Sequence, residues 1–261
     1  REQHIKRERA TSNICTAQVL LAVMAGMYAV YHGKSGLIEI ANKINRLARI
    51  LDDRLKSLNI EQINKIYFDT IHIKFPTNKL KKLSETKKIN FNYINENELS
   101  ISINEATEIN DIEKICEIFE FILSKKSNIE EIESINPSIP TLYTRKKSFL
   151  DEKVFNSFQS ETSMMRYIKS LERKDLSLNH SMIALGSCTM KLNAAAEMLP
   201  LSSSRWNNIH PFAPSDQVEG YTFMLEKLKN QLNEITGFSG TSLQPNSGAQ
   251  GEYAGLMVIR S

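Results

Sequence analysis

The chain has 261 residues, of which 41% are hydrophobic and 24% charged, and its formal net charge is +3. This composition is typical of a soluble globular protein, and the length suffices for one large domain or two ordinary ones. A net charge this small gives no support to nucleic-acid binding through bulk electrostatics. The basic cluster between Arg1 and Arg9 is interpreted as a solvated helical face.

The cysteines Cys15, Cys116 and Cys188 lie far apart, and no C-x-x-C pair occurs. This spacing argues against a zinc site or a disulfide framework and favours a reducing compartment. No signal peptide is visible at the Arg-Glu-Gln-His start. Together with the abrupt end at Ser261, this start suggests an internal fragment.

The first predicted element is a helix from about Ile14 to Tyr31, which is largely apolar and nearly long enough to span a membrane. Polar and small residues interrupt it, so a buried helix of a large enzyme is favoured over a membrane helix. The segment 32–36, His-Gly-Lys-Ser-Gly, is predicted to break it. A second helix follows, because apolar residues alternate at spacings of four and three. They are Leu37, Ala41, Ile44, Ala48, Leu51, Leu55 and Leu58.

The pattern changes to a small α+β unit over residues 60–124. Alternation with period two predicts strands over 69–75, through Ile89, Phe91 and Tyr93, and through Leu99, Ile101 and Ile103. Helices are predicted over 77–86 and from Ile109 to Leu123, and a turn at 95–97. The predicted order is β-α-β-β-α, a small antiparallel layer.

Residues 125–159 lose this periodicity and are predicted to be a linker. A second unit is predicted from about Ser160, where a helix begins that includes Met164 and Leu171. Its middle is irregular, from His180 to Ser215. A regular helix then runs from Val218 to Ile235 and ends at Gly237, as a C-terminal cap glycine predicts.

The loop from Leu185 to Asn193 gathers several polar side chains in irregular sequence, as functional loops often do. The candidates are Ser187, Cys188, Thr189, Lys191 and Asn193. A turn followed by a helix cap remains an equal alternative. Nothing in the sequence supplies a base for Cys188, so a nucleophilic role is weakly supported.

His210 lies between Ile209 and Pro211 in the segment Asn-Ile-His-Pro-Phe-Ala-Pro. The two prolines are predicted to hold this backbone extended and to fix where the imidazole points. A lone histidine is more often structural than catalytic, so both readings stay open.

The segment 243–252 is a turn rich in small residues that runs into an apolar helical stretch. A helix that begins there would present free backbone N–H groups and the positive end of its dipole to an anion. Ser247, Gly248, Ala249 and Gln250 are the candidate phosphate-binding residues. The turn is neither a Walker loop nor a dinucleotide fingerprint, so by itself it does not define which phosphate binds.

Three stretches resemble the pyridoxal-phosphate-dependent glycine decarboxylases, the P-proteins of the glycine cleavage system. They are 1–16, from Arg-Glu-Gln-His-Ile to Asn-Ile-Cys-Thr; 180–193, with Leu-Gly-Ser-Cys-Thr-Met-Lys-Leu-Asn; and 209–253, with Ile-His-Pro-Phe-Ala-Pro and Gln-Pro-Asn-Ser-Gly-Ala-Gln-Gly-Glu-Tyr. The resemblance covers most of 1–58 and 160–261, whereas 60–155 matches only in position and element order.

The resemblance implies two tandem halves of the α/β aminotransferase-like fold (fold type I), with the second half catalytic. Residues 1–124 would then end the first half, with 60–124 as its small domain. Residues 125–159 would connect the halves, and 160–261 would open the second half. This fragment itself would be mostly helical with a small α+β domain.

The resemblance also implies a reaction. Glycine would be decarboxylated with pyridoxal 5'-phosphate as cofactor, and the aminomethyl group would pass to the lipoyl arm of H-protein. Residues 247–250 match the phosphate-binding turn, and the 186–193 loop and His210 match stretches expected near the active site. A homodimer of two-half chains is expected, without nucleic acid, metal or membrane partners. The compartment would be the cytoplasm in a bacterium or the mitochondrial matrix in a eukaryote.

One departure concerns the Schiff-base lysine, which in this family lies in a His-Lys motif downstream of the phosphate turn. No His-Lys pair occurs in the 261 residues, and Lys191 lies upstream in a different motif. The fragment alone is therefore expected to be inactive. Two alternatives remain: another fold-type-I enzyme, such as an aminotransferase or desulfurase, and a non-catalytic partner subunit.

Overall fold

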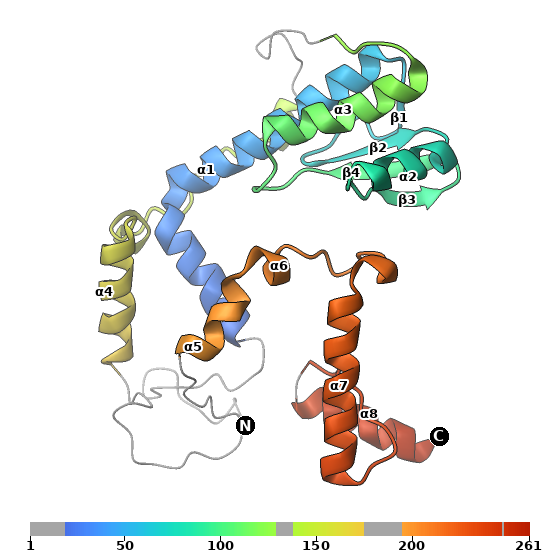
Figure 1. Ribbon diagram of the computed structural model, residues 1–261. Coiled ribbons are helices and arrows are strands. Elements are labelled where there is room, and N and C mark those ends of the chain that lie inside the picture. The colour runs from blue at the N-terminus through green and yellow to red at the C-terminus, as the bar shows by residue number, and fades with distance from the viewer. Residues whose placement is uncertain (1–18, 129–137, 175–194, 247) are drawn as a thin grey trace. The chain divides into compact units, whose positions relative to one another are not determined.

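The computed structural model describes residues 19–128, 138–174, 195–246 and 248–261 (Figure 1). The chain forms two compact units, one from residues 29–159 and one from residues 1–28 with 160–261. In the part of the chain that the structure describes, no helix has the length and apolar character needed to cross a membrane.

Helix α1 (Val19–Ser57) is two helices joined at Gly33, whose φ of 63° and ψ of −172° are not helical. The predicted break at 32–36 is therefore confirmed, whereas the predicted start near Ile14 lies outside the described residues. The prediction that the first helix is buried is wrong for Leu21 and Met24, which are 67% and 59% exposed. Their apolar side chains have no covering layer among the described residues.

The segment that follows the small domain packs against the kink in α1. A Cβ atom on Gly33 would lie 2.4 Å from Gln159 Nε2 and 2.5 Å from the carbonyl oxygen of Phe155. Beside it, the Lys34 ammonium donates to Ser148 and to Asp151 Oδ1. Two short 3₁₀ turns, η4 (Thr141–Tyr143) and η5 (Lys153–Asn156), occur in this segment.

A four-stranded antiparallel sheet forms the centre of the small domain, with strand order β1-β2-β4-β3. The predicted β-α-β-β-α order is confirmed, and a two-residue strand β1 precedes it. The elements are β1 (Glu61–Gln62), β2 (Thr70–Lys74), α2 (Thr77–Thr86), β3 (Asn92–Asn95), β4 (Glu98–Ser102) and α3 (Ile109–Leu123). The strand predicted around Ile89 begins three residues later, because the chain reaches the sheet only at Asn92.

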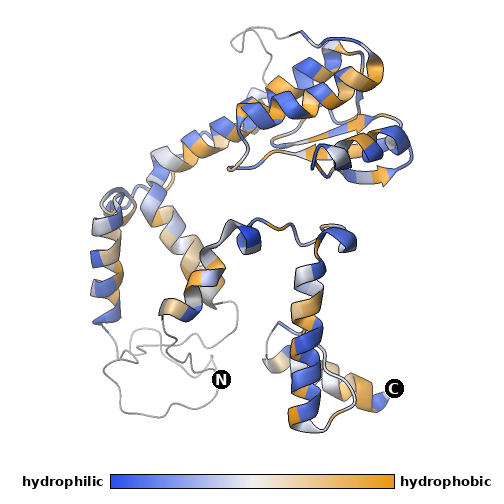
Figure 2. Ribbon diagram, viewed as in Figure 1, coloured by the Kyte–Doolittle hydropathy of each residue, from blue (hydrophilic) through white to orange (hydrophobic). Residues whose placement is uncertain are grey.

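The period-two pattern of β2 and β4 places one apolar layer on the same face of the sheet. Ile71 pairs with Ile101 and Ile73 with Leu99 in the antiparallel register, and their exposures range from 0 to 5%. Helices α1, α2 and α3 supply the other side of this core, with α3 apolar along one stripe and polar along another (Figure 2). The helical residues that are fully buried include Leu51, Leu55, Leu80, Ile112, Ile118 and Phe119.

The other unit is described as a series of helices. They are α4 (Glu161–Glu172), α5 (Ala195–Met198), α6 (Ser204–Asn207), α7 (Glu219–Thr236) and α8 (Gly248–Arg260), with the 3₁₀ turns η6 (Leu199–Ser202) and η7 (Ser215–Gln217). Ser160 caps α4 by accepting from the Ser163 N–H. Gly237 ends α7 with a φ of 72°, which confirms the predicted glycine cap.

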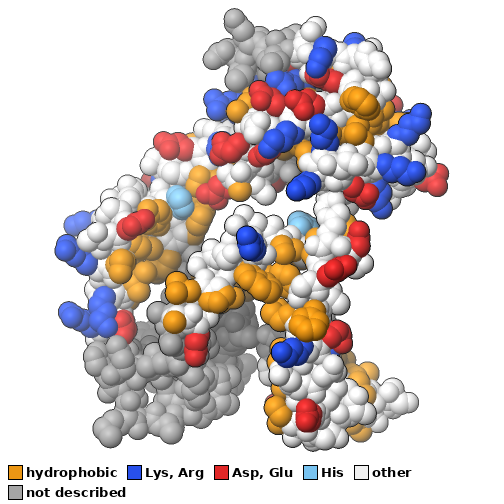
Figure 3. Space-filling view, viewed as in Figure 1, with side chains coloured by type: hydrophobic (Ala, Val, Ile, Leu, Met, Phe, Trp, Pro, Cys, Tyr) orange, Lys and Arg blue, Asp and Glu red, His pale blue; other side chains and the backbone are white. Residues whose placement is uncertain are grey.

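Apolar side chains of α7 and α8 lie on the surface of this unit. Phe223 is 71% exposed, Ile235 80% and Ile259 83%, and Figure 3 shows hydrophobic side chains on the visible surface of these helices. The periodicity of α7 correctly predicts a helix. The apolar stripe of α7, however, is not covered by any of the described residues.

A buried polar contact joins Asp52 of α1 to Tyr67, which lies between β1 and β2. The Tyr67 hydroxyl donates to Asp52 Oδ2 at 2.6 Å, and Lys56 Nζ donates to the same oxygen at 2.7 Å. Burial, and then the hydrogen bond to the Asp52 carboxylate, raises the pKa of Tyr67 well above its ordinary value of 10.0. The other Asp52 oxygen, Oδ1, is buried without a partner among the described residues.

Substitution of Gly33 by alanine is expected to destabilise the chain by about 2–4 kcal/mol. The backbone of Gly33 lies in a region that essentially only glycine adopts, which costs a residue with a Cβ atom about 1–3 kcal/mol. The clash with residues 155 and 159 adds an overpacking cost. Gly26→Ala is the matched control in the same helix, where a Cβ atom meets nothing within 4 Å. Urea unfolding followed by circular dichroism measures both variants, and equal stabilities would contradict the close packing at Gly33.

The Tyr67–Asp52 bond predicts a loss of stability at alkaline pH. Because the pKa of Tyr67 is raised in the folded state, its contribution is complete below pH 10.0 and is lost as the pH rises beyond that value. Tyr67→Phe should cost about 1–3 kcal/mol at neutral pH and should flatten the stability profile above pH 10.0. Urea titrations on both sides of that pH test this, and a variant as alkali-sensitive as the parent would contradict it.

Candidate functional site

The predicted phosphate turn lies at the start of α8. Gly248, Ala249 and Gln250 are its first three residues, which confirms the predicted helix, whereas Ser247 lies outside the described residues. The Asn246 N–H donates to Gln250 Oε1 at 2.9 Å, so this side chain is folded back over the turn. The first N–H groups of a helix lack acceptors within it, and the helix dipole makes this end partly positive. Phosphate binding therefore remains a prediction, and the backbone at the start of α8 has a geometry that suits it.

The glycine that opens α8 has free space around it. A Cβ atom on Gly248 would meet no atom within 4 Å, and one on Gly251 would meet only the Cβ of Pro245 at 3.9 Å. All three predicted residues at this end are exposed. The start of α8 is thus exposed and uncrowded at its two glycines among the described residues.

The backbone after His210 forms a tight turn, so the predicted extended backbone is wrong at Pro211 and Phe212. The Ala213 N–H donates to the carbonyl of His210 at 3.0 Å, which places Pro211 at the second position of a β-turn. Proline is favoured there, because its fixed φ suits that turn position. The second proline, Pro214, is extended as predicted, with φ −53° and ψ 139°.

The same turn fixes the imidazole. The Phe212 N–H donates to His210 Nδ1 at 3.0 Å, and the two rings lie 5.9 Å apart between centroids. Both side chains are exposed. The sequence identified His210 as a candidate, and the structure shows that its orientation is set by the backbone two residues further along the chain.

A pair of aromatic residues closes the loop that carries His210. The Tyr221 hydroxyl donates to the carbonyl of Trp206 at 2.6 Å, and their rings meet edge to face with centroids 4.9 Å apart. Trp206 belongs to α6 and Tyr221 to the first turn of α7. No sequence motif predicts this pairing, because the two residues are fifteen positions apart and share no pattern.

The polar loop candidates Ser187, Cys188, Thr189, Lys191 and Asn193 all lie outside the described residues. Their predicted proximity to His210 and to the phosphate turn therefore stays a prediction. Of the three cysteines, Cys116 is described. Its thiol is buried in α3, and burial raises its pKa to about 11 against the opposing effect of Arg54. Cys116 is therefore an unreactive core thiol.

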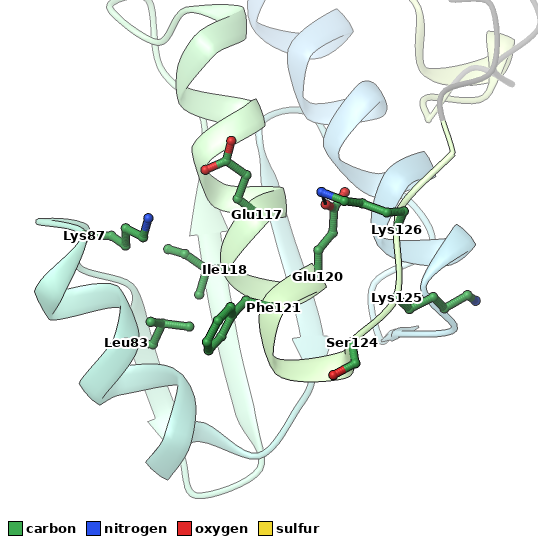
Figure 4. Close-up of a pocket in the computed structure, with 9 residues that line it drawn as sticks. All are labelled: Leu83, Lys87, Glu117, Ile118, Glu120, Phe121, Ser124, Lys125 and Lys126. Atoms are coloured by element: carbon green, nitrogen blue, oxygen red, sulfur yellow. Dashed lines mark hydrogen bonds and ion pairs between the residues drawn. The ribbon is translucent and has the colours of Figure 1, made fainter.

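A groove between α2 and α3 is a second feature, which the sequence did not predict (Figure 4). It has a volume of about 780 Å³. Leu83 of α2 and Phe121 of α3 face the groove, and Phe121 is 75% exposed. None of the predicted site residues lines it. The lining residues are Leu83, Lys87, Glu117, Ile118, Glu120, Phe121, Ser124, Lys125 and Lys126.

The Glu120 carboxylate, which lines this groove, stabilises the end of α3 through hydrogen bonds. Glu120 accepts from the Ser127 hydroxyl at 2.5 Å, from the Ser127 N–H at 3.0 Å and from Lys126 Nζ at 2.9 Å. Burial by itself would raise the pKa of Glu120, but these hydrogen bonds outweigh it and lower the pKa from 4.5 to about 2. The groove is thus bounded by a satisfied structural carboxylate and offers no acid–base group at this position.

Glu120 predicts a loss of stability in acid. Its pKa is depressed in the folded state, so its contribution is present above pH 4.5 and is lost as the pH falls towards about 2. Glu120→Gln should lower stability at neutral pH and weaken the dependence on pH over that range. Glu113→Gln, an exposed change on the same helix, is the control. If the stability of the two variants depended equally on pH in this range, the stabilising role of Glu120 would be contradicted.

The family model "Glycine cleavage system P-protein" matches residues 1–119. Proteins named glycine dehydrogenase (decarboxylating) align with the whole chain, at 62% identity in Christiangramia forsetii, 59% in Flavobacterium johnsoniae and 47% in Nostoc sp.. The chain spans 28%, 28% and 27% of the length of these three relatives.

Over its whole length the chain is therefore similar to a class of proteins named for the decarboxylation of glycine. Residues 1–119 match the glycine cleavage system P-protein family, and the whole chain is similar to the proteins named glycine dehydrogenase (decarboxylating). The alignments run through 60–155, where the sequence motifs gave no specific resemblance.

Proposed function

We propose that the protein to which this chain belongs decarboxylates glycine with pyridoxal 5'-phosphate and transfers the aminomethyl group to the lipoyl arm of H-protein. The names of the relatives support the glycine-decarboxylating part of this activity. The start of α8 carries the structural part of the proposal. It offers exposed N–H groups, a positive dipole end and open space at Gly248, all of which fit a phosphate group.

Each part of the proposed site would have its own task. The backbone of residues 248–250 would hold the cofactor phosphate, and Gln250 would brace the turn through its bond to Asn246. His210 and the 186–193 loop would contact the substrate or the cofactor. The cofactor, when bound, supplies an electron sink for the pair left when carbon dioxide departs. The Schiff-base lysine would come from a His-Lys pair outside these 261 residues.

The two alternative functions differ from the proposed one in the substrate or the cofactor that they require. Another fold-type-I enzyme, such as an aminotransferase or desulfurase, would accept different amino acids, and the names of the relatives disfavour it. A non-catalytic partner subunit would bind no cofactor through the α8 turn. We propose a homodimeric assembly, and a cytoplasmic location in a bacterial host, since the three relatives compared are bacterial.

The phosphate-binding role of α8 is tested by charge. Ala249→Asp in the full-length protein places a carboxylate among the N–H groups that would hold the phosphate, so the affinity for pyridoxal phosphate should fall by about tenfold or more. Ala254→Asp puts the same charge further along the helix, where the dipole effect has decayed. Absorbance titration of the apoprotein measures both, and equal affinities would rule out this turn as the anchor.

The missing lysine motif gives a second prediction. When the 261-residue chain is incubated with pyridoxal phosphate and reduced with borohydride, no specific lysine label is expected, because no His-Lys pair is present. Mass spectrometry of the digested protein detects any label. Stoichiometric labelling of one lysine, Lys191 included, would show that the site is differently arranged.

A further inference from the structure

The turn at His210 determines which ring nitrogen carries the proton. Two backbone N–H groups after Pro211 point back to residue 210: that of Ala213 to the carbonyl, and that of Phe212 to Nδ1, each at 3.0 Å. Nδ1 must therefore act as an acceptor. A neutral imidazole has one donor and one acceptor nitrogen, so an accepting Nδ1 places the proton on Nε2.

The second nitrogen is available to a ligand. The His210 side chain is exposed, and no described residue forms a hydrogen bond or ion pair with its Nε2. The Phe212 ring lies beside the imidazole in a tilted arrangement, 5.9 Å between centroids. The imidazole thus presents an N–H group outward from a turn whose inner hydrogen bonds are made by the chain itself.

The position of this N–H group is also constrained from both ends of the loop. Trp206 precedes the loop, and Tyr221 follows it in α7. Tyr221 binds Trp206 through both its hydroxyl and its ring. For Nε2 of the neutral His210 ring to accept a proton from a substrate, the proton of the ring would first have to lie on Nδ1. There it would face the Phe212 N–H, and the turn would lose its bond, which is costly because two donors then oppose each other.

We propose that His210 acts in the active site as a hydrogen-bond donor through Nε2 to an anionic oxygen, and not as a general base. The inference rests on the proposed function for the identity of that oxygen, which is either the substrate carboxylate or an oxygen of the cofactor. An N–H donor aimed at an anionic oxygen makes a charge-assisted bond, which is stronger than a neutral one.

The first test concerns the chain alone and does not depend on the proposed function. In the ¹⁵N-labelled 261-residue protein, the neutral form of His210 should be protonated at Nε2 only. A scalar coupling should be measurable between the Phe212 amide nitrogen and His210 Nδ1. The signals are assigned by their loss in His210→Gln. A detectable Nδ1–H form of His210, or the absence of the coupling, would overturn the inference.

The second test uses the full-length enzyme and two matched substitutions. His210→Gln keeps a donor at about the position of Nε2 and provides no base, whereas His210→Glu provides a base and no donor. The glutamine variant should bind its ligand about tenfold more tightly than the glutamate variant. A difference in the KM for glycine identifies the carboxylate as the acceptor, and a difference in the Kd for pyridoxal phosphate identifies the cofactor.

If the glutamate variant equals or exceeds the glutamine variant in both quantities, the donor role is wrong even when the coupling is present. If the coupling is present but neither glycine nor pyridoxal phosphate binds the parent enzyme, the proposed function fails instead. The two failures are thereby distinguished.

Discussion

A single apolar layer holds together the best-packed part of this chain. Alternate residues of β2 and β4 meet in register, and the helices α1, α2 and α3 cover them from one side. Each of these side chains removes enough apolar surface from water to contribute about 1.5–3 kcal/mol. Helix α1 contributes to this layer from Leu47 onward, and its Asp52 accepts the Tyr67 hydroxyl beside it. The hydrogen bonds of Glu120 then hold the end of α3, which covers the same layer.

The candidate site is built on different principles. The start of α8 and the His210 turn depend on backbone hydrogen bonds and on one aromatic pair, with exposed apolar side chains around them. Such local bonds can fix the direction of an N–H group without a core beneath it. The chain spans 28% of the length of its relatives, and the apolar stripes of α7 and α8 are the surfaces on which further packing would act.

The sequence predicted most of what depends on local periodicity. Helices α2 and α3 have the predicted bounds, and α4 and α7 begin within one residue of the predicted position, because apolar spacing and cap residues are encoded locally. The break at Gly33 was also predicted, from the segment 32–36. The turn at Pro211 and Phe212 was not predicted, because a proline restricts the residue before it but leaves the conformation after it open.

The parts that could not be predicted depend on contacts between distant residues. The groove between Leu83 and Phe121 and the pairing of Trp206 with Tyr221 join segments that share no motif. A weak signal for the groove existed, since Phe121 departs from the apolar stripe of α3. For the site, composition and spacing indicated an anion at a helix N-terminus, and only the resemblance to a family specified which anion.

The central claim is that the turn before α8 belongs to a glycine decarboxylase that works with H-protein. Its most direct test is the exchange of the glycine carboxyl group with labelled bicarbonate, catalysed by the full-length protein with pyridoxal phosphate. The account predicts exchange that requires lipoylated H-protein and is specific for glycine. Exchange that proceeds equally well without H-protein, or no exchange when both are present, would contradict it.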